Sequence, residues 1–340
     1  MTNTQWEALK AVVNGKKIEN PLTGFIIDCP WLPQWYGISI LDYFSNDELW
    51  LKANLKAIET FPDVIFLPGF WSEYGMCTEP SAFGAKSVFF HDDFPFANKL
   101  IETTEDIDKL TLPNPATDGL LPFMLNRLVK ARPAIEVAGH HIRFSVSRGP
   151  LNIASFLMGT TEFLTMMMMD PDAAHKLLRI ITDFLKDWHK LQHDTIDSID
   201  GIMMLDDIVG FLGEDEFKEF AYPYLKELYD TNDSIKLFHN DADCTQSVKY
   251  YPELGINLYN PGIHMTLTEL REVTGDKMAI LGNIPPRDVL AAASTAEVKI
   301  AAQTLKAEAA GFDKMVFSCA GGMPPAVSTK NIQAFTEGLK

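Results

Sequence analysis

The sequence predicts an α/β protein folded as a single (β/α)8 barrel, and three observations support this prediction. Short apolar runs rich in Val, Ile, Leu and Phe alternate with longer helical segments along the 340 residues. There are eight such runs, and their nearly continuous apolar character is typical of parallel strands covered on both faces. No Gly-rich phosphate loop follows the first run, so a doubly wound open sheet is the second choice.

The expected strands are therefore the eight apolar runs, taken in chain order. They are GFIID (24–28), VIFLPG (64–69), IRFSVS (142–147), GIMMLDD (201–207), IKLFHND (235–241), INLYNPG (256–262), MAILGNI (278–284) and KMVFSCAG (314–321).

Two segments do not fit the alternation of strands and helices. Residues 1–22 include MTNTQWEALK, whose apolar spacing predicts an N-terminal helical extension. Residues 70–135 are too many for one crossover and contain SVFFHDDF, which suggests a hairpin or lid over one mouth of the barrel. Because we find no internal repeat or linker, we expect residues 1–340 to form one TIM-barrel domain with these two additions.

The composition excludes some classes of function. The formal net charge is −17, so nucleic-acid binding is not expected, because phosphate neutralisation needs clustered Lys and Arg. The longest apolar stretch, FLTMMMM at 163–169, is too short to cross a bilayer. The four cysteines are widely spaced and no secretion signal is recognised, so we expect a cytoplasmic protein with reduced thiols. Among them, Cys29 and Cys77 are interpreted as buried thiols.

Polar residues end nearly every expected strand, and active sites of TIM barrels form at the C-terminal ends of the strands. This convergence predicts a functional site. The residues concerned are Asp28, Arg148, Asp206, Asp207, His239, Asp241, Asn260, Asn283 and Cys319.

Three of these residues suggest a metal site. The spacing His-x-Asp places His239 and Asp241 on the same side of an extended segment, and Cys319 ends the eighth strand. An imidazole, a carboxylate and a thiolate suit zinc and leave one coordination position open, as in catalytic zinc sites. Cys244 is an alternative ligand, although its place at a helix start favours capping or packing.

The adjacent Asp206 and Asp207 end the fourth strand, and Arg148 ends the third. Paired carboxylates could perform acid–base work, orient a ligand or bind magnesium, and an arginine could clamp a carboxylate or phosphate. A structural role is an equal alternative, with one aspartate capping the following helix and the other pairing with Arg148.

The loops after the first two strands are rich in aromatic residues. Trp31, Trp35 and Tyr36 occur in WLPQWYG, and Trp71 follows the second strand. Exposed rings would form an apolar wall for a flat ligand, and packing against the barrel helices is an equal alternative.

Several long runs together resemble the uroporphyrinogen decarboxylase superfamily, particularly its zinc- and corrinoid-dependent methyltransferase branch. The resemblance spans nearly the whole chain and implies a TIM barrel. The runs are SRGPLNIASFLMGTTEFLTMMMMDPDAAHKLL, MMLDDIVGFLGEDEFKEFAYPYLKEL, FHNDADCTQSVKYYPELGINLYNPG, LGNIPPRDVL and SCAGGMPPAVSTKNIQAF.

The resemblance also implies a ligand set. In methylcobamide:coenzyme M methyltransferases a His-x-Cys pair and a later Cys hold zinc, and the match places His239 and Cys319 on the first and last of these ligands. Asp241 stands where the family has its middle cysteine. A carboxylate in place of a thiolate leaves zinc a stronger Lewis acid, which favours an oxygen leaving group over thiol activation.

We therefore expect a zinc-dependent methyltransferase that moves a methyl group from an aromatic methyl ether to the cobalt of a separate corrinoid protein, as in O-demethylase systems. Asp206, Asp207 and Arg148 would position the substrate, and Asn260 and Asn283 would bind it or the corrinoid. The corrinoid is assigned to a partner because this sequence lacks a DxHxxG cobalamin-binding pattern. A homodimer is one open possibility for its assembly.

Three alternatives stay open. The enzyme could transfer methyl from a corrinoid to a thiol, it could be a decarboxylase, or it could be a non-catalytic module that docks a corrinoid protein. Porphyrinogen decarboxylation is disfavoured because GFIIDCPWLPQWYG, around the first strand, contains no arginine for the substrate carboxylates.

Overall fold

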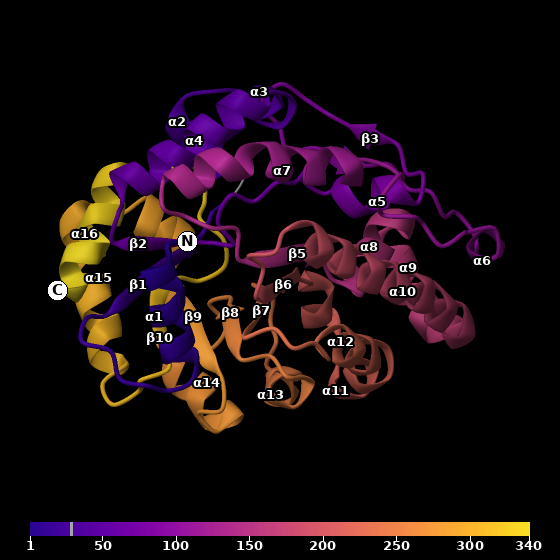
Figure 1. Ribbon diagram of the computed structural model, residues 1–340. Coiled ribbons are helices and arrows are strands. Elements are labelled where there is room, and N and C mark those ends of the chain that lie inside the picture. Colours follow the sequence, from indigo (N-terminus) through magenta and orange to yellow (C-terminus); the bar gives the residue numbers. More distant parts are fainter. Residues whose placement is uncertain (28–29) are drawn as a thin grey trace.

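The computed structural model describes residues 1–27 and 30–340. Eight parallel strands form one sheet, which is curled into a TIM-barrel-like half-barrel (Figure 1). Its order is β2-β1-β10-β9-β8-β7-β6-β5, so strands that follow one another in the chain are neighbours, except β2 and β5, which form the two edges. This order confirms the predicted barrel class, because a doubly wound sheet would reverse direction at a switch point. In the described part of the chain, no backbone ladder joins the two outermost strands.

Each expected strand overlaps one observed strand. The observed strands of the large sheet are β1 (Leu22–Ile26), β2 (Val64–Leu67), β5 (Phe144–Arg148), β6 (Gly201–Leu205), β7 (Ile235–Asn240), β8 (Leu258–Pro261), β9 (Ala279–Ile284) and β10 (Met315–Cys319).

Helices cover the outer face of the sheet. The N-terminal third contains α1 (Asn3–Val13), α2 (Trp31–Tyr36), α3 (Ile40–Ser45), α4 (Asp47–Thr60), α5 (Thr78–Ala82) and α6 (Thr104–Ile107). The middle contains α7 (Leu121–Val137), α8 (Pro150–Met158), α9 (Thr160–Met169), α10 (Pro171–Thr195), η1 (Asp207–Phe211), α11 (Glu214–Glu216), η2 (Phe217–Ala221) and α12 (Tyr222–Leu228). The rest contains η3 (Val248–Tyr250), α13 (Tyr251–Leu254), α14 (Leu267–Thr274), η4 (Pro286–Ala291), α15 (Thr295–Glu308) and α16 (Thr329–Leu339).

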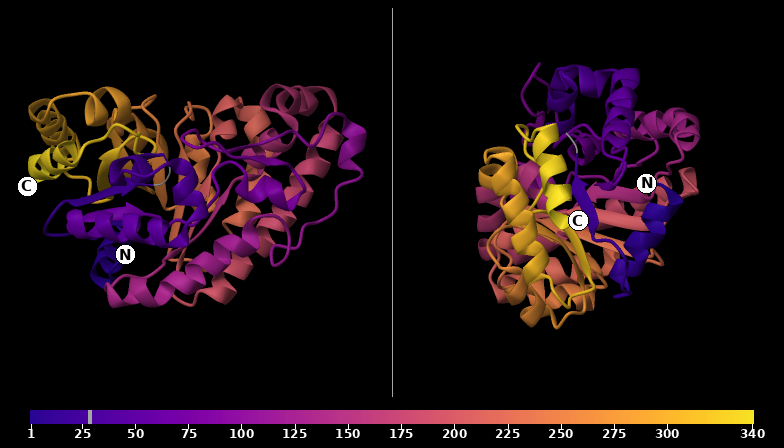
Figure 2. Two further views of the ribbon diagram at one scale, coloured as in Figure 1. Left: turned by 90° about the horizontal axis from the view of Figure 1, so that it is seen from above. Right: turned by 90° about the vertical axis from the view of Figure 1, so that its left-hand side faces the viewer.

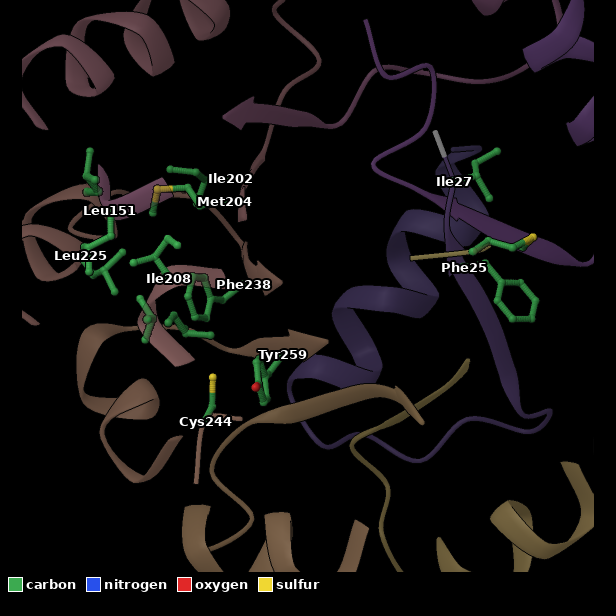
Figure 3. Packing of buried hydrophobic residues seen from close by; sticks show 14 of the residues in the cluster. Phe25, Ile27, Leu151, Ile202, Met204, Ile208, Leu225, Phe238, Cys244 and Tyr259 are labelled. Atoms are coloured by element: carbon green, nitrogen blue, oxygen red, sulfur yellow. The ribbon is translucent and has the colours of Figure 1, made fainter. Parts of the chain in front are cut away.

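The strands separate two hydrophobic cores, because successive side chains of a strand point to opposite faces. The outer core lies between sheet and helices, and Figure 3 shows part of it around Phe238 and Tyr259. The inner core fills the barrel and includes Val146, Met203, Leu237, Leu281 and Val316.

Helix α1 covers the N-terminal ends of the strands (Figures 1 and 2). Thr2 and Gln5 form a capping box at its start, as expected for an amphipathic helix with a defined N-terminus. Trp6 packs edge-on against Phe144 of β5, with ring centroids 5.4 Å apart, and its indole N–H donates to Asp200 at 3.1 Å. The opposite mouth of the barrel is therefore the end left for a site.

The segment between β2 and β5 contains a short antiparallel hairpin, β3 (Ser87–Val88) and β4 (Phe96–Ala97). The run SVFFHDDF, for which a hairpin or lid is predicted, contributes β3 and the turn of this hairpin, and β4 follows it. Leu41 of α3 donates its backbone N–H to the hairpin carbonyl of His91 at 3.0 Å. The last part of the segment forms α7, which precedes β5. The assignment of the chain to one domain with two additions stays a prediction.

Candidate metal site

Three side chains with metal-ligating atoms converge at the ends of β6 and β7. The ligand atoms of Asp207, His239 and Asp241 all lie within 4.8 Å of one another. His239 lies in β7 on the inner face, since Ile235 and Leu237 of the same parity belong to the inner core. Strand register pairs Leu205 with His239, so the residues that follow each strand meet at one edge.

A backbone contact links the two loops of this cluster. The N–H of Asp241 donates to Asp207 Oδ1 at 3.2 Å, which holds the two carboxylates on neighbouring loops. Burial raises the pKa of the Asp207 carboxyl and Asp241 raises it further, whereas His239 acts in the opposite direction. A bound cation would favour the ionised form of Asp207.

The imidazole of His239 is oriented by Asn260 of β8. His239 Nδ1 lies 2.7 Å from Asn260 Oδ1, and Asn260 Nδ2 in turn donates to the carbonyl of Leu281 at 2.7 Å. An amide oxygen fixed in this way selects the tautomer with a proton on Nδ1 and leaves Nε2 as the metal-binding nitrogen. Asn260 thus acts on His239 in this structure, whereas the sequence predicts contact with substrate or corrinoid.

Two glycines let the backbone approach Asp241 closely. A Cβ at Gly262 would lie 2.1 Å from the carbonyl oxygen of Asp241. A Cβ at Gly321, where φ is +61°, would lie 3.0 Å from Asp241 Oδ2. Any side chain at Gly262 would therefore displace Asp241, so the loop after β8 helps to shape the site.

The residues present fit a divalent metal ion. An imidazole with a fixed free nitrogen and two carboxylates supply ligands that zinc accepts, and carboxylates also suit harder metals such as Mn²⁺. The sequence predicts a metal group on His239 and Asp241, and the structure groups Asp207 with them.

Cys319, the third predicted ligand, lies elsewhere. In β10, Val316 faces the inner core, whereas Phe317 and Cys319 belong to the outer core. The thiol is completely buried, and burial raises its pKa to about 12. Ligation by Cys319 stays a prediction from the sequence alone, and the ligand set that the geometry supports is Asp207, His239 and Asp241.

Asp206 is fully buried and caps α8. Its two carboxylate oxygens accept the backbone N–H groups of Leu151 and Asn152, each at 2.9 Å. Burial raises the pKa of Asp206, whereas these hydrogen bonds act in the opposite direction. The sequence considered a cap on the helix that follows the two aspartates, whereas Asp206 caps α8, the helix after β5.

Arg148 forms a buried ion-pair cluster with two glutamates that the sequence did not single out. Its Nη2 lies 2.9 Å from Glu73 Oε2, its Nη1 lies 3.6 Å from Glu79 Oε2, and Glu79 also accepts its backbone N–H. The pKa of Glu73 is raised mainly by burial, and the charge of Arg148 opposes this. The pairing of Arg148 with Asp206 or Asp207, considered from the sequence, is therefore replaced by pairing with Glu73 and Glu79. Glu73 lies in the loop after β2 and Glu79 lies in α5, so the signal available in the sequence was two acidic residues in the segment after a strand.

The predicted aromatic wall is partly a packing element. Trp31 is fully buried, stacks on Trp35 with centroids 5.2 Å apart, and donates its indole N–H to the carbonyl of Val327 at 3.0 Å. Trp35 donates to Thr329 Oγ1 at 2.9 Å, and Tyr36 is half-buried. These contacts join α2 to the start of α16.

The remaining candidates have structural partners or lie outside the described residues. Asn283 Nδ2 donates to the carbonyl of Met265 at 3.0 Å. Cys77 is buried, as predicted, and Cys244 is buried among Tyr251 and Tyr259, where burial raises its thiol pKa to about 11. Packing is thus the observed role of Cys244. The predictions for Asp28 and Cys29 fall outside the described residues.

In the described part of the chain, no helix combines the length and apolar character needed to cross a bilayer.

The fold and cluster define the chain as a TIM-barrel-like protein with a carboxylate–histidine group at the C-terminal ends of its strands. The sequence profile described as Uroporphyrinogen decarboxylase (URO-D) matches residues 33–340, and the chain belongs to this family.

Individual relatives are distant. The chain is 23% identical over 239 residues to a uroporphyrinogen decarboxylase of Geobacter metallireducens, covering 68% of each chain. It is 23% identical over 316 residues to that of Hydrogenovibrio crunogenus, covering 88% of this chain and 85% of the relative.

Two solved structures share the fold. A methyltransferase from Methanosarcina mazei superposes with a TM-score of 0.83 at 17% identity, covering 97% of this chain and 96% of that one. A B12-independent methionine synthase from Shewanella gives a TM-score of 0.61 at 13% identity, covering 94% and 97%. At these identities the likeness establishes the fold.

Proposed function

We propose that this protein is a metal-dependent methyltransferase that transfers the methyl group of an aromatic methyl ether to cobalt(I) of a corrinoid protein. The observation that carries the proposal is the Asp207–His239–Asp241 cluster, whose ligand atoms lie within 4.8 Å of one another at the barrel mouth. The structural likeness to a methyltransferase supports the reaction class. Zinc is the preferred metal, and the donor, the metal and the corrinoid acceptor are parts of this proposal.

The residues would divide the work as follows. His239 Nε2, Asp207 and Asp241 would hold the metal, and Asn260 would keep the imidazole in the required tautomer through its 2.7 Å contact with Nδ1. The bound metal would supply Lewis acidity at the ether oxygen. During transfer the methyl carbon leaves oxygen for cobalt(I), and the electron pair of the broken C–O bond stays on the oxygen as a phenolate. The phenolate takes a proton from solvent on release.

The donor set favours an oxygen leaving group. Two carboxylates and one imidazole leave a metal harder than a set with two thiolates, and a hard centre suits a phenolate more than a thiolate. Transfer to a thiol acceptor is therefore the second choice among methyl transfers.

Decarboxylation is the other candidate, since the named relatives are uroporphyrinogen decarboxylases. A polycarboxylate substrate needs several cationic side chains. Arg148, whose strand position faces the barrel mouth, is instead ion-paired to Glu73 and Glu79. This pairing weighs against that chemistry at this end of the barrel.

The test mixes zinc-loaded protein, chemically reduced cobalamin and a panel of methoxybenzoates, and follows the loss of the cobalt(I) absorption band. We expect loss of the band with at least one methoxyarene and appearance of the matching phenol. A His239→Ala variant prepared in parallel should leave the band unchanged, because the metal would lose its only nitrogen ligand. No reaction with any methoxyarene, together with methylation of a thiol by methylcobalamin, would replace the proposal with the thiol alternative.

The Asp241→Cys variant tests the leaving-group argument. We expect it to retain the metal and to lose ether demethylation, because thiolate donation lowers the Lewis acidity of zinc. Undiminished demethylation by the zinc-loaded variant would show that the carboxylate does not tune the site. Decarboxylation of a porphyrinogen by the wild type, without any corrinoid reaction, would favour the decarboxylase alternative.

A further inference from the structure

A second cavity lies away from the metal cluster, between α3, α4, α7 and the β3–β4 hairpin. Its volume is about 800 Å³. Figure 1 shows α4 and α7 side by side along one edge of the molecule, with α3 and β3 next to them. A volume of this size is in the range of pockets that bind small organic molecules.

Four aromatic side chains form part of the cavity wall. Phe44, Tyr74, Phe89 and Phe123 line it, and Phe123 is 61% exposed. Phe89 packs edge-on against Tyr74, with centroids 6.4 Å apart and an interplanar angle of 89°. Rings in this arrangement offer both faces and edges to a flat apolar ligand.

The cavity also contains a buried guanidinium. Arg127 is only 1% exposed and is held by three partners on the cavity wall. Its Nε donates to Asp47 Oδ1 at 2.7 Å, and its Nη2 donates to the Tyr74 hydroxyl at 3.1 Å and to the carbonyl of Phe44. Its Nη1 has no hydrogen-bond partner among the described residues.

An unsatisfied buried guanidinium nitrogen is costly, and a hydrogen-bond acceptor from a ligand would remove that cost. The Arg127 side chain is already fixed, because its Cζ also lies 4.9 Å from the Tyr74 ring centroid. Little conformational entropy would be lost when a ligand binds to it. Since Arg127 is almost fully buried, contact with Nη1 requires side-chain movement at the cavity wall, of which Arg127 is a part.

The charged residues around the cavity determine which kind of hydrogen-bond acceptor a ligand should carry. Lys130 lies one helical turn beyond Arg127 on the same face of α7 and favours an anion. Asp47 and Glu48, at the start of α4, also line the cavity and oppose a multiply charged anion such as phosphate. Asp47 is paired with Arg127 and Glu48 is paired with Lys52, so the ammonium of Lys130 is the charge left over, and a single negative charge fits best.

From the cavity, its aromatic side chains and the unpaired Nη1 of Arg127, we propose that this is a binding site for a small aromatic monocarboxylate, separate from the metal cluster. The carboxylate accepts a hydrogen bond from Nη1, and the ring lies among Phe44, Phe89 and Phe123. This inference does not depend on the proposed methyl transfer, because none of its residues belongs to the metal cluster.

The test is calorimetric titration of the full chain with sodium benzoate, with benzyl alcohol as the uncharged comparison. We expect one saturable site for benzoate with a Kd of about 1 mM or tighter. Benzyl alcohol should bind at least about tenfold more weakly, because it lacks the carboxylate that pairs with a charged donor.

Two substitutions in the cavity and one control test whether benzoate binds there. Arg127→Lys keeps the positive charge and removes Nη1, and should weaken benzoate at least about tenfold. Phe123→Ser should weaken benzoate several-fold. Val137→Ser, at a 90% exposed position at the other end of α7, is the matched control and should leave the affinity unchanged. Circular dichroism and thermal melting confirm that each variant is folded.

Three outcomes would overturn the inference. The first is the absence of saturable benzoate binding by the wild type. The second is binding that is unaffected by both Phe123→Ser and Arg127→Lys. The third is binding that His239→Ala abolishes while Phe123→Ser leaves it intact, because benzoate would then occupy the metal cluster. Since Phe123 is largely exposed, its variant keeps the test decisive even if Arg127→Lys fails to fold.

Discussion

Two polar clusters at the barrel mouth differ in how their charges are balanced. On the β2–β5 side, the guanidinium of Arg148 lies between the carboxylates of Glu73 and Glu79, so the chain supplies its own cation. On the β6–β7 side, Asp207 and Asp241 converge with the imidazole of His239, and an external cation fits the set. Both clusters consist of polar residues in or just after strands. The Arg148 cluster is a structural ion-pair network, whereas the Asp207–His239–Asp241 cluster is suited to binding a ligand.

The two clusters are close enough to share one substrate. Register pairs Arg148 with Leu205 and Leu205 with His239, so the clusters are two strands apart, or about 10 Å along the sheet. A ligand at the metal cluster would therefore lie near the rigid Arg148 cluster. The comparison predicts different responses to substitution on the two sides.

The largest expected effect is on the metal. His239→Ala and Asp207→Asn should each abolish retention of a divalent metal after gel filtration, because only two ligands of the group would stay. Cys319→Ser is the matched comparison and should retain the metal, since this cysteine belongs to the outer core. Metal content is measured by mass spectrometry after loading with zinc. Metal loss in Cys319→Ser combined with full retention in Asp207→Asn would restore the ligand set expected from the sequence.

The next largest effect is on the free energy of unfolding, and it concerns the Arg148 cluster on the β2–β5 side. Arg148→Met should lower the free energy of unfolding by about 3–5 kcal/mol, because two buried carboxylates would lose their cation. Arg132→Met, which breaks surface ion pairs with Glu136 and Asp197, should cost no more than about 1 kcal/mol. Denaturant unfolding measures both. Adding Glu73→Gln and Glu79→Gln to Arg148→Met should recover much of the loss, and a failure to recover would show that Arg148 stabilises by packing alone.

The smallest expected effect is on the pH dependence of stability. It concerns a third polar cluster, of His189 with Ser145 and Ser147, which contains no arginine. His189 of α10 is buried between Ser147, 2.8 Å from its Nε2, and Ser145, 2.9 Å from its Nδ1, and burial lowers its pKa to about 3. The unfolded chain takes up this proton near pH 6.5, whereas the folded protein resists uptake down to about pH 3. Stability should therefore fall as the pH drops below 6.5, by about 2 kcal/mol at pH 5.

His189→Gln tests this assignment, because glutamine can bond both serines and does not titrate. Unfolding is followed at pH 7 and pH 5 in the wild type and the variant. The variant should lose less stability over this interval, since the carboxyl groups of the two proteins are the same. An equal loss in both proteins would assign the acid sensitivity to groups other than His189.

The strands could be predicted from the sequence because burial on both faces leaves a continuous apolar run. The ends of these runs also mark the C-terminal ends of the strands, where His239 and Asp241 were predicted as metal ligands. Both residues lie in the observed cluster. The participation of Asp207 depended on the register of Leu205 against His239, which the sequence does not encode locally.

The face on which Cys319 lies depends on strand parity. In a run such as MVFSC every residue is apolar or small, so the pattern does not distinguish inward from outward positions. Only contact with other elements assigns Val316 to the inner core and Cys319 to the outer one. Glu73 and Glu79 were missed for a related reason, since their pairing with Arg148 spans about seventy residues.

The contact between α1 and the barrel has a consequence for the order of folding during synthesis. Trp6 donates its indole N–H to Asp200, a residue 194 positions later, and packs against Phe144. When α1 leaves the ribosome, the surface on which it docks has not been made, and more than half of the chain must follow first. The helix therefore exposes Trp6 and Leu9 during most of translation, and its docking belongs among the late events of co-translational assembly.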